Sequence, residues 1–310
     1  MRLSLRPNEK TSAVLVTAAR LLAVLALGAL LGTTYLLVIR PRELRWGATD
    51  AEVARPMPED GLVEHPAFDA TRAITINGTP EEIWPWLAQM GYRRAGFYGY
   101  DLIENIASGT GIRSARTILP RLQDPHPGDE FPISAVASMA FGQVEPNRFL
   151  VWRGTEVPPN GVFIWQLTAE DESHTRLISR IRWSYHKNYP ARALDLFTEF
   201  GDHVAVPEIL RGIRDRVEGR PPESLSVEGF EIAAWLLGMV ELAASAVFVL
   251  CWRRWKRAWL LALGAGLLLQ FVLYGSVPVW VSAALPWLYL VVIVGCWRQE
   301  RRLPHHQRTA

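Results

Sequence analysis

The chain has 310 residues, a formal net charge of +2 at pH 7 and an apolar fraction of 49%. This fraction is high for a soluble protein and indicates membrane-spanning segments, while the near-neutral charge gives no support for a nucleic-acid-binding protein. The two cysteines, Cys251 and Cys296, lie in a C-terminal apolar region, which excludes a disulfide framework from the rest of the chain.

The first apolar segment, residues 21–39, contains 19 residues and no charge. At about 1.5 Å per residue it can cross most of a hydrocarbon core of roughly 30 Å. A cleaved signal peptide is the alternative, because Arg2, Arg6 and Lys10 form a basic N-terminal region. The run exceeds a usual signal-peptide core and ends in VIRPREL without small residues, so we expect a retained anchor within a first region, 1–45.

A second region, residues 46–222, has the size and polarity of one soluble domain. It opens with a short helix candidate capped by Thr49 or Asp50, followed by an alternating strand at 71–76. The segment TPEEIWPWLAQMG then predicts a helix, with a cap at Thr79 and a proline at the first helical position.

Strand-like runs follow: DEFPI, MAFGQVEP, RFLVWRG, GVFIWQLT and HTRLISRIRWSY. In the last run, alternation predicts one buried face and one wet face that carries the three arginines Arg176, Arg180 and Arg182. Residues 191–219 have helical spacing, with a possible bend at Gly201 or Pro207, and we interpret Asp202 and His203 as surface residues. Strand, helix, several strands and a long helix form an α+β order.

The segment GFYGYDLIEN, residues 96–105, combines aromatic rings with carboxylates. Asp101 and Glu104 have the spacing of a capping box, in which each side chain accepts from a backbone N–H of the first helical turn. An acid/base pair is the alternative, since residues three apart share a helix face. Tyr98 and Tyr100 alternate around a glycine and could offer hydroxyls to a ligand.

The segments TRAITINGTPEEIWPWLAQMG, GFYGYDLIEN, GDEFPI and VEPNRFLVWRG resemble the membrane-anchored members of the START-like superfamily, also called SRPBCC or polyketide cyclase/dehydrase-like. The resemblance covers residues 71–218. It implies a helix-grip fold, in which a curved antiparallel sheet wraps a long C-terminal helix around a cavity for apolar ligands. The function is not inherited with such a fold. The predicted ligand-binding residues are Tyr98, Tyr100, Asn105, Trp165, Trp183 and Tyr185.

The C-terminal region, 223–310, contains three further apolar stretches at 232–250, 258–275 and 279–297. The loop CWRRWKRAW is cationic and rich in tryptophan, which places it in the cytoplasm by the positive-inside rule. With four transmembrane helices, one N-terminal and three C-terminal, both termini are then cytoplasmic and the soluble domain is extracytoplasmic. Arg40, Arg42 and Arg45 count against this orientation.

Glu241 lies at the centre of the 232–250 stretch, where an ionised carboxylate is costly and an ionisable group is a functional candidate. Gln270 and Ser245 are possible partners, and a hydrogen bond between helices is the simpler role.

These observations predict an integral plasma-membrane protein whose soluble domain binds a lipid or other apolar small molecule, without a metal or another cofactor. A cyclase- or hydratase-like enzyme using the same cavity, with Asp101 and Glu104 as weak catalytic candidates, is one alternative. A structural or signalling membrane protein without a ligand is the other. No nucleic-acid partner is predicted, and the sequence does not identify a protein partner.

Overall fold

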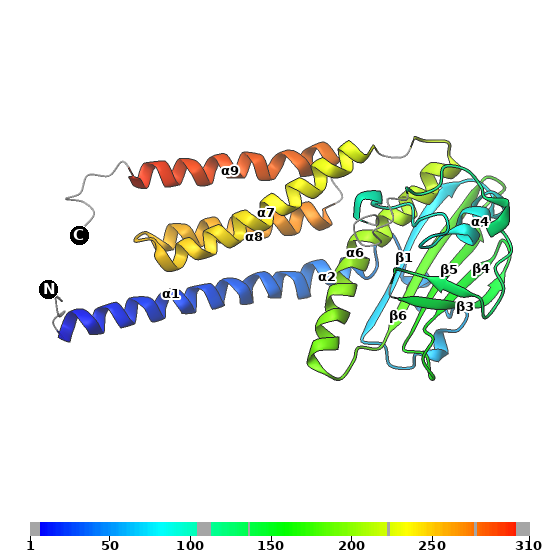
Figure 1. Ribbon diagram of the computed structural model, residues 1–310, viewed down its shortest axis with the longest axis horizontal. Helices are drawn as coiled ribbons and strands as arrows, with labels where there is room; N and C mark the ends of the chain where they lie inside the picture. The colour runs from blue at the N-terminus through cyan, green and yellow to red at the C-terminus, as the bar shows by residue number, and fades with distance from the viewer. Residues whose placement is uncertain (1–6, 104–112, 136, 222–223, 276–277, 302–310) are drawn as a thin grey trace. The chain divides into compact units, whose positions relative to one another are not determined.

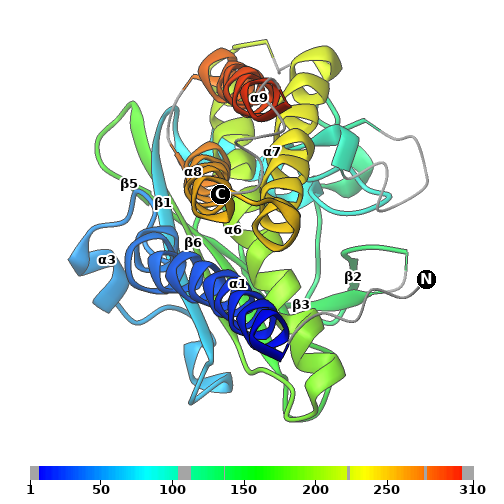
Figure 2. The same cartoon turned by 90° about the vertical axis from the view of Figure 1, so that its left-hand side faces the viewer.

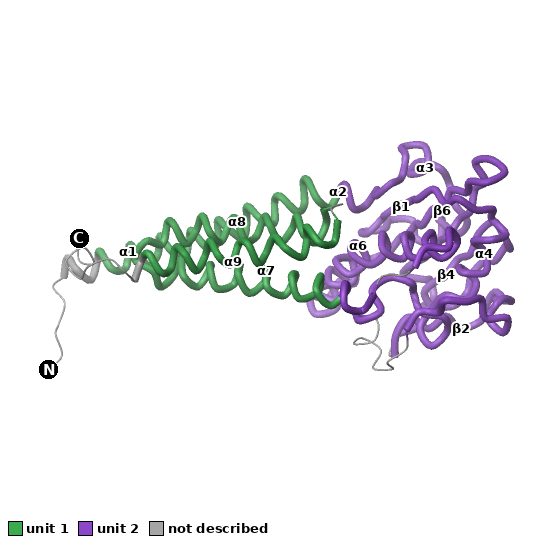
Figure 3. Tube along the Cα trace, turned by 90° about the horizontal axis from the view of Figure 1, so that it is seen from above, with its two compact units in different colours: residues 1–40, 229–310 green, residues 41–228 purple. Residues whose placement is uncertain are grey.

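A computed structural model describes residues 7–103, 113–135, 137–221, 224–275 and 278–301. The chain divides into two compact units, which Figure 3 colours separately. Unit 1 consists of Met1–Arg40 and Gly229–Ala310, and unit 2 is the continuous segment Pro41–Glu228. Unit 1 is therefore formed by the two ends of the chain.

Unit 1 is helical. Helix α1 (Pro7–Thr34) continues through a π-helical segment, η1 (Tyr35–Ile39), into α2 (Arg40–Glu43). The C-terminal helices are α7 (Leu225–Cys251), α8 (Trp255–Tyr274) and α9 (Val279–Arg301). Within the described ranges, four helices are long and apolar enough to cross a membrane, as predicted. They cover Ser12–Glu43, Leu225–Cys251, Trp255–Tyr274 and Val279–Gln299.

Side chains that donate to backbone carbonyls connect these helices. Trp259 Nε1 donates to the Ala23 carbonyl at 2.8 Å, and Tyr289 donates its hydroxyl to the Leu261 carbonyl, also at 2.8 Å. In an apolar environment such bonds satisfy both the side chain and the carbonyl that it contacts. Polar groups therefore hold α1 to α8 and α8 to α9.

Unit 2 contains a six-stranded, fully antiparallel sheet in the order β1-β6-β5-β4-β3-β2. The strands are β1 (Phe68–Asn77), β2 (Glu130–Pro132), β3 (Ser138–Glu145), β4 (Phe149–Arg153), β5 (Gly161–Ala169) and β6 (His174–Trp183). The first and last strands pair along ten residues, from Phe68 opposite Trp183 to Asn77 opposite His174. This pairing brings the two ends of the strand sequence together at one edge of the sheet. The antiparallel sheet with its separate helices confirms the predicted α+β class.

Two helices cover one face of the sheet, which we call the inner face. Helix α6 (Tyr189–Val217) lies along it in Figure 1, and α4 (Pro80–Gln89) packs beside α6. The capping box of Thr79 and Glu82 and the proline at the first position begin α4 as predicted. A long helix held on a curved antiparallel sheet is the helix-grip arrangement. Helix α6 continues through Gly201 and Pro207 as one element.

The opposite, outer face of the sheet is covered by residues 49–63, which contain α3 (Asp50–Ala54) and η2 (Asp60–Leu62). Figure 2 shows α3 and α6 on opposite sides of β1 and β6. The prediction of a wet arginine face is therefore wrong. Arg180 is 4% exposed and donates to the carbonyls of Arg55, Glu52 and Val53.

The guanidinium of Arg176 is bound by the same region, because its Nε donates to the carboxylate of Glu52 at 2.7 Å and its Nη2 donates to the Gly47 carbonyl. Burial of Glu52 raises its pKa, but the hydrogen bonds from Arg176 and Thr49 and the positive charge of Arg176 together outweigh this effect, so the pKa lies below its ordinary value. The backbone carbonyls of residues 47–55 thus accept hydrogen bonds from Arg176 and Arg180 that water would accept on an exposed sheet face. The alternation of β6 was predicted correctly, but it could not reveal the segment that covers the outer face.

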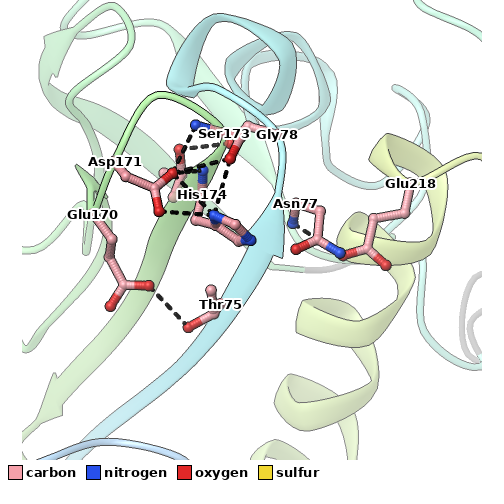
Figure 4. Close-up of polar contacts among 9 residues, drawn as sticks. Thr75, Asn77, Gly78, Glu170, Asp171, Ser173, His174 and Glu218 are labelled. Atoms are coloured by element: carbon pink, nitrogen blue, oxygen red, sulfur yellow. Dashed lines mark hydrogen bonds and ion pairs between the residues drawn. The ribbon is translucent and has the colours of Figure 1, made fainter.

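The β5–β6 turn is organised by Asp171, as Figure 4 shows. Its Oδ1 accepts from the backbone amides of Ser173 at 2.7 Å and His174 at 2.8 Å. These bonds and the contact with the His174 ring lower the pKa of Asp171 to about 2. At the neighbouring end of β1, the Asn77 amide donates to Glu218 just beyond α6. The turn fixes the register of β5 and β6, which carry most of the candidate site.

Candidate functional site

Large aromatic residues gather on the inner face of β4, β5 and β6. We call the following five side chains the aromatic patch: Trp152, Phe163, Trp165, Trp183 and Tyr185. Antiparallel register places Trp152 opposite Phe163, and the ring centroids of Phe163 and Trp165 are 5.1 Å apart in a stacked geometry. The Trp183 ring lies over Gly161, where an added Cβ would fall 2.2 Å from it. Three predicted ligand-binding residues therefore share one surface.

Four polar atoms in or beside this patch are buried and have no hydrogen-bond partner among the described residues. They are Trp152 Nε1, Trp165 Nε1, Ser179 Oγ and Tyr185 Oη. Ser179 is the cross-strand neighbour of Trp165, so its hydroxyl lies on the same face. An indole N–H can only donate a hydrogen bond, whereas a hydroxyl can donate or accept. Buried polar groups are nearly always paired in folded proteins.

The polar side of α6 faces the same sheet. His203 is buried and the side chain of Asp202 is only 7% exposed, so the prediction that they lie on the surface is wrong. Arg72, which is fully buried on β1, contacts Asp202 Oδ2 at 2.6 Å and His203 Nδ1 at 2.7 Å. Since a guanidinium only donates, His203 Nδ1 must accept. The proton of a neutral His203 is then on Nε2, which lies 3.3 Å from Glu199 Oε1.

This cluster lies next to the aromatic patch. Arg72 is the cross-strand neighbour of Ser179, and the His203 ring meets Phe68 edge-on at a centroid distance of 5.5 Å. The Arg72 Nε group also donates to the Glu43 carbonyl at 2.7 Å. Sequence reasoning missed the cluster because Arg72 and His203 are 131 residues apart. The only local signal was an arginine at an inward-facing position of the alternating strand.

A separate pocket of about 160 Å³ lies between residues 98–101 and the C-terminal half of α6. Tyr98, Tyr100 and Asp101 line it, together with charged residues: Glu208, Arg211, Arg214, Asp215, Arg216, Arg220 and Glu228. Burial raises the pKa of Glu208, although Arg211 opposes the shift. The predicted residues of the GFYGYD segment thus line a pocket on unit 2 that also contains several charged side chains.

The side chain of Tyr98 makes several contacts within unit 2. Its hydroxyl donates to the Trp86 carbonyl at 3.0 Å, its ring meets that of Trp86 edge-on, and Arg216 lies 4.4 Å above the ring centroid. Its φ is +69°, and a Cβ at Gly212 would fall 1.9 Å from its carbonyl oxygen. The glycine therefore permits the close approach of α6 to this segment.

Asp101 begins a helical stretch that is described as far as Ile103. Its Oδ1 accepts from the backbone amide of Ser114 at 3.0 Å, which ties the start of this stretch to a residue 13 positions later. Glu104 and Asn105 lie outside the described residues, so the capping box and the acid/base pair stay predictions. The Leu102 amide donates to Glu228 at 3.0 Å, so a second carboxylate contacts this helix start.

In unit 1, Glu241 is 2% exposed, and neither carboxylate oxygen has a hydrogen-bond partner among the described residues. Gln270 Nε2 instead donates to the Leu31 carbonyl at 3.0 Å, and the Ser245 hydroxyl is also unpaired within the described part of the chain. The roles predicted for Glu241 and Gln270 remain untested, but Gln270 has a defined contact in the helix bundle.

Comparisons with solved structures give matches at low sequence identity and low TM-score. A protein from Mesorhizobium loti matches 49% of this chain and 98% of its own, at 19% identity and a TM-score of 0.28. A polyketide-cyclase-like protein from Corynebacterium glutamicum matches 48% and 91%, at 15% identity and 0.31. Aha1 from Colwellia psychrerythraea matches 48% and 96%, at 14% identity and 0.26. No protein-family model and no curated protein matches the chain.

Proposed function

We propose that the chain is a membrane-tethered binding module, whose unit 2 takes up a lipid or other apolar small molecule against the inner face of the sheet. The observation that carries this proposal is that the indole N–H groups of Trp152 and Trp165, which lie among aromatic rings, have no hydrogen-bond partner in the described part of the chain. Aromatic side chains with a few unpaired polar groups are typical of sites for small apolar ligands.

The chemistry of the unpaired atoms describes the ligand further. Two donors, Trp152 Nε1 and Trp165 Nε1, are supplemented by the hydroxyls of Ser179 and Tyr185. The ligand therefore carries a hydrogen-bond acceptor, such as a carbonyl or carboxylate, on an otherwise apolar body. Such molecules partition into bilayers, and the four candidate spans would hold unit 2 where they are concentrated.

Native mass spectrometry of the full chain in mild detergent tests the proposal. We expect an additional mass that corresponds to a bound lipid-like molecule, or binding of added cis-parinaric acid, a fluorescent fatty acid with a carboxylate. Trp152→Phe and Trp165→Phe keep an aromatic ring and remove the N–H, so each should raise the dissociation constant for cis-parinaric acid by about 2- to 13-fold, which corresponds to roughly 0.5–1.5 kcal/mol.

Trp84→Phe is the matched control. Trp84 is a buried tryptophan on α4, and its indole nitrogen is not among the unpaired atoms. This variant should bind like the unaltered protein. The proposal fails if the unaltered chain carries no additional mass and also does not bind cis-parinaric acid, or if all three tryptophan variants lose binding equally.

A further inference from the structure

The first half of α6 has its polar and apolar sides reversed relative to a helix of a soluble protein. Its buried positions are Asp195, Glu199 and His203, spaced at intervals of four residues. The same stripe continues in the second half of α6 with apolar residues, namely Val206, Leu210 and Ile213. Since residues four apart share a helix face, one continuous buried stripe changes from polar to apolar along α6.

The outward side of this first half is apolar. Tyr189 is 89% exposed, Leu194 64%, Leu196 54% and Phe197 70%. Among the other described large apolar side chains of unit 2 that are exposed, only Val157 exceeds 40%. We call Tyr189, Leu194 and Phe197 the exposed apolar face of α6. Concentration of such side chains on one short segment marks a surface that contacts another apolar medium.

The buried polar residues fix this orientation of the helix. Asp195 accepts from the backbone amide of His186 at 2.6 Å, while His203 and Asp202 hold Arg72. Rotating α6 to bury Leu194 and Phe197 would break these contacts. The buried guanidinium group of Arg72 would then lose Asp202 and His203 as partners. The outward direction of the apolar side chains is therefore imposed by charges inside unit 2.

The first candidate membrane span ends near this apolar surface, so a lipid bilayer would be close to it. The candidate span Ser12–Glu43 ends at Glu43, whose carbonyl binds Arg72, and Arg72 in turn binds His203 on α6. Phe197 is six residues from His203 along α6 and Tyr189 is 14 residues from it, which correspond to about 9 and 21 Å. The exposed apolar face thus begins close to the point at which the first span ends.

From these observations we infer that the first half of α6 lies in the interface of the bilayer, with Tyr189, Leu194 and Phe197 inserted among the lipids. The exposed basic residues Lys187 and Arg192 flank this face and would meet lipid phosphates. The inference rests on the membrane tether proposed above, and it adds a second, peripheral contact that places the N-terminal half of α6 against the lipids.

Site-specific fluorescence in vesicles tests the contact. Cys251 and Cys296 are replaced by serine, and Phe197→Cys is labelled with the fluorophore NBD in the full chain. The protein is reconstituted into vesicles of phosphatidylcholine and phosphatidylglycerol, with or without phosphatidylcholine that carries a nitroxide near the top of its acyl chain. Glu81→Cys is the matched control, because Glu81 is an exposed residue on α4, the second helix of the inner face.

We expect blue-shifted NBD emission at position 197 that the nitroxide lipid quenches, and water-like, unquenched emission at position 81. Leu194→Cys takes the place of Phe197→Cys if that variant does not fold. Water-like emission at both α6 positions overturns the inference. Blue-shifted emission without lipid quenching also overturns it, because a second copy of the chain would then cover the face.

Alkaline carbonate extraction of the same vesicles separates this inference from the tether. If the protein resists extraction but shows no quenching at position 197, the proposed tether is retained and the contact of α6 with the bilayer is refuted. A chain that carbonate removes refutes the tether itself.

Discussion

Arg72 and Asp202 form an ion pair of 2.6 Å between β1 and α6, in which the exposed fractions of the two side chains are 0% and 7%. A buried pair of this kind contributes little net stability compared with a well-packed apolar pair, but removing one partner leaves an uncompensated charge in the interior. The pair thus positions α6 on the sheet more than it stabilises unit 2.

Asp202→Asn should therefore be strongly destabilising. The variant removes the negative charge beside Arg72, and we expect a loss of about 3–5 kcal/mol in the free energy of unfolding. Chemical unfolding of the full chain in detergent, followed by tryptophan fluorescence, measures it. Glu81→Gln, an exposed change on α4, should stay within about 0.5 kcal/mol of the unaltered protein. Equal stabilities of the two variants would contradict the role of the pair.

At Asp101, two substitutions separate a structural acceptor from a proton donor. Asp101→Asn retains Oδ1 for the Ser114 amide and should keep most of the stability, whereas Asp101→Ala leaves that amide unpaired and should cost about 1–3 kcal/mol. Thermal unfolding monitored by circular dichroism compares them. If both variants are as stable as the unaltered protein, the contact with Ser114 contributes nothing. A reaction lost in both variants would instead favour the acid/base hypothesis.

The β5–β6 turn should respond to pH through Asp171. Its pKa in the folded protein is depressed to about 2, from an ordinary value of 3.8. The stabilising contribution is therefore present above about pH 4 and is lost as the pH falls through about 2. Hydrogen exchange of the Ser173 and His174 amides should accelerate relative to other turns in this window. Asp171→Asn does not titrate, so an identical pH response in that variant would rule out Asp171 as the cause.

Substitutions of Glu241 and Gln270 should have different effects on the stability of unit 1. Glu241→Gln should preserve expression and thermal stability in detergent, since its carboxylate has no hydrogen-bond partner among the described residues. Gln270→Leu removes the bond to the Leu31 carbonyl and should destabilise the contact of α1 with α8 by about 0.6 kcal/mol. Loss of ligand uptake by Glu241→Gln at unchanged stability would refute a purely structural role and favour a proton-linked one.

Local signals predicted the elements of unit 2 well. Thr79 and Pro80 began α4 at the expected residue, and the alternation of residues 174–183 assigned Leu177 and Trp183 to the inner face. These features depend on neighbours only a few residues away in the sequence, so a pattern with the correct period is sufficient to find them.

The candidate site could not be predicted to the same extent, because its contacts connect distant segments. An arginine on an alternating strand is ordinarily solvated, and nothing near Arg180 in the sequence shows that residues 49–63 cover it. Likewise, Asp202 and His203 are adjacent in the sequence, yet both reach Arg72 from the middle of α6. The aromatic patch was predicted in part, since Trp165, Trp183 and Tyr185 were proposed but Trp152 was not.

The cover of the outer face also limits how unit 2 can be isolated or transplanted. Arg176 and Arg180 find acceptors on residues 47–60, so a fragment that begins at the first strand would carry two guanidinium groups over bare apolar side chains. Val151, Ile164 and Ile178, which the same segment covers, would become accessible on that face. The minimal autonomous form of the domain therefore includes the residues from Glu43 onward, because the Glu43 carbonyl also accepts from the buried Arg72. Any chimera must transfer this segment together with β6.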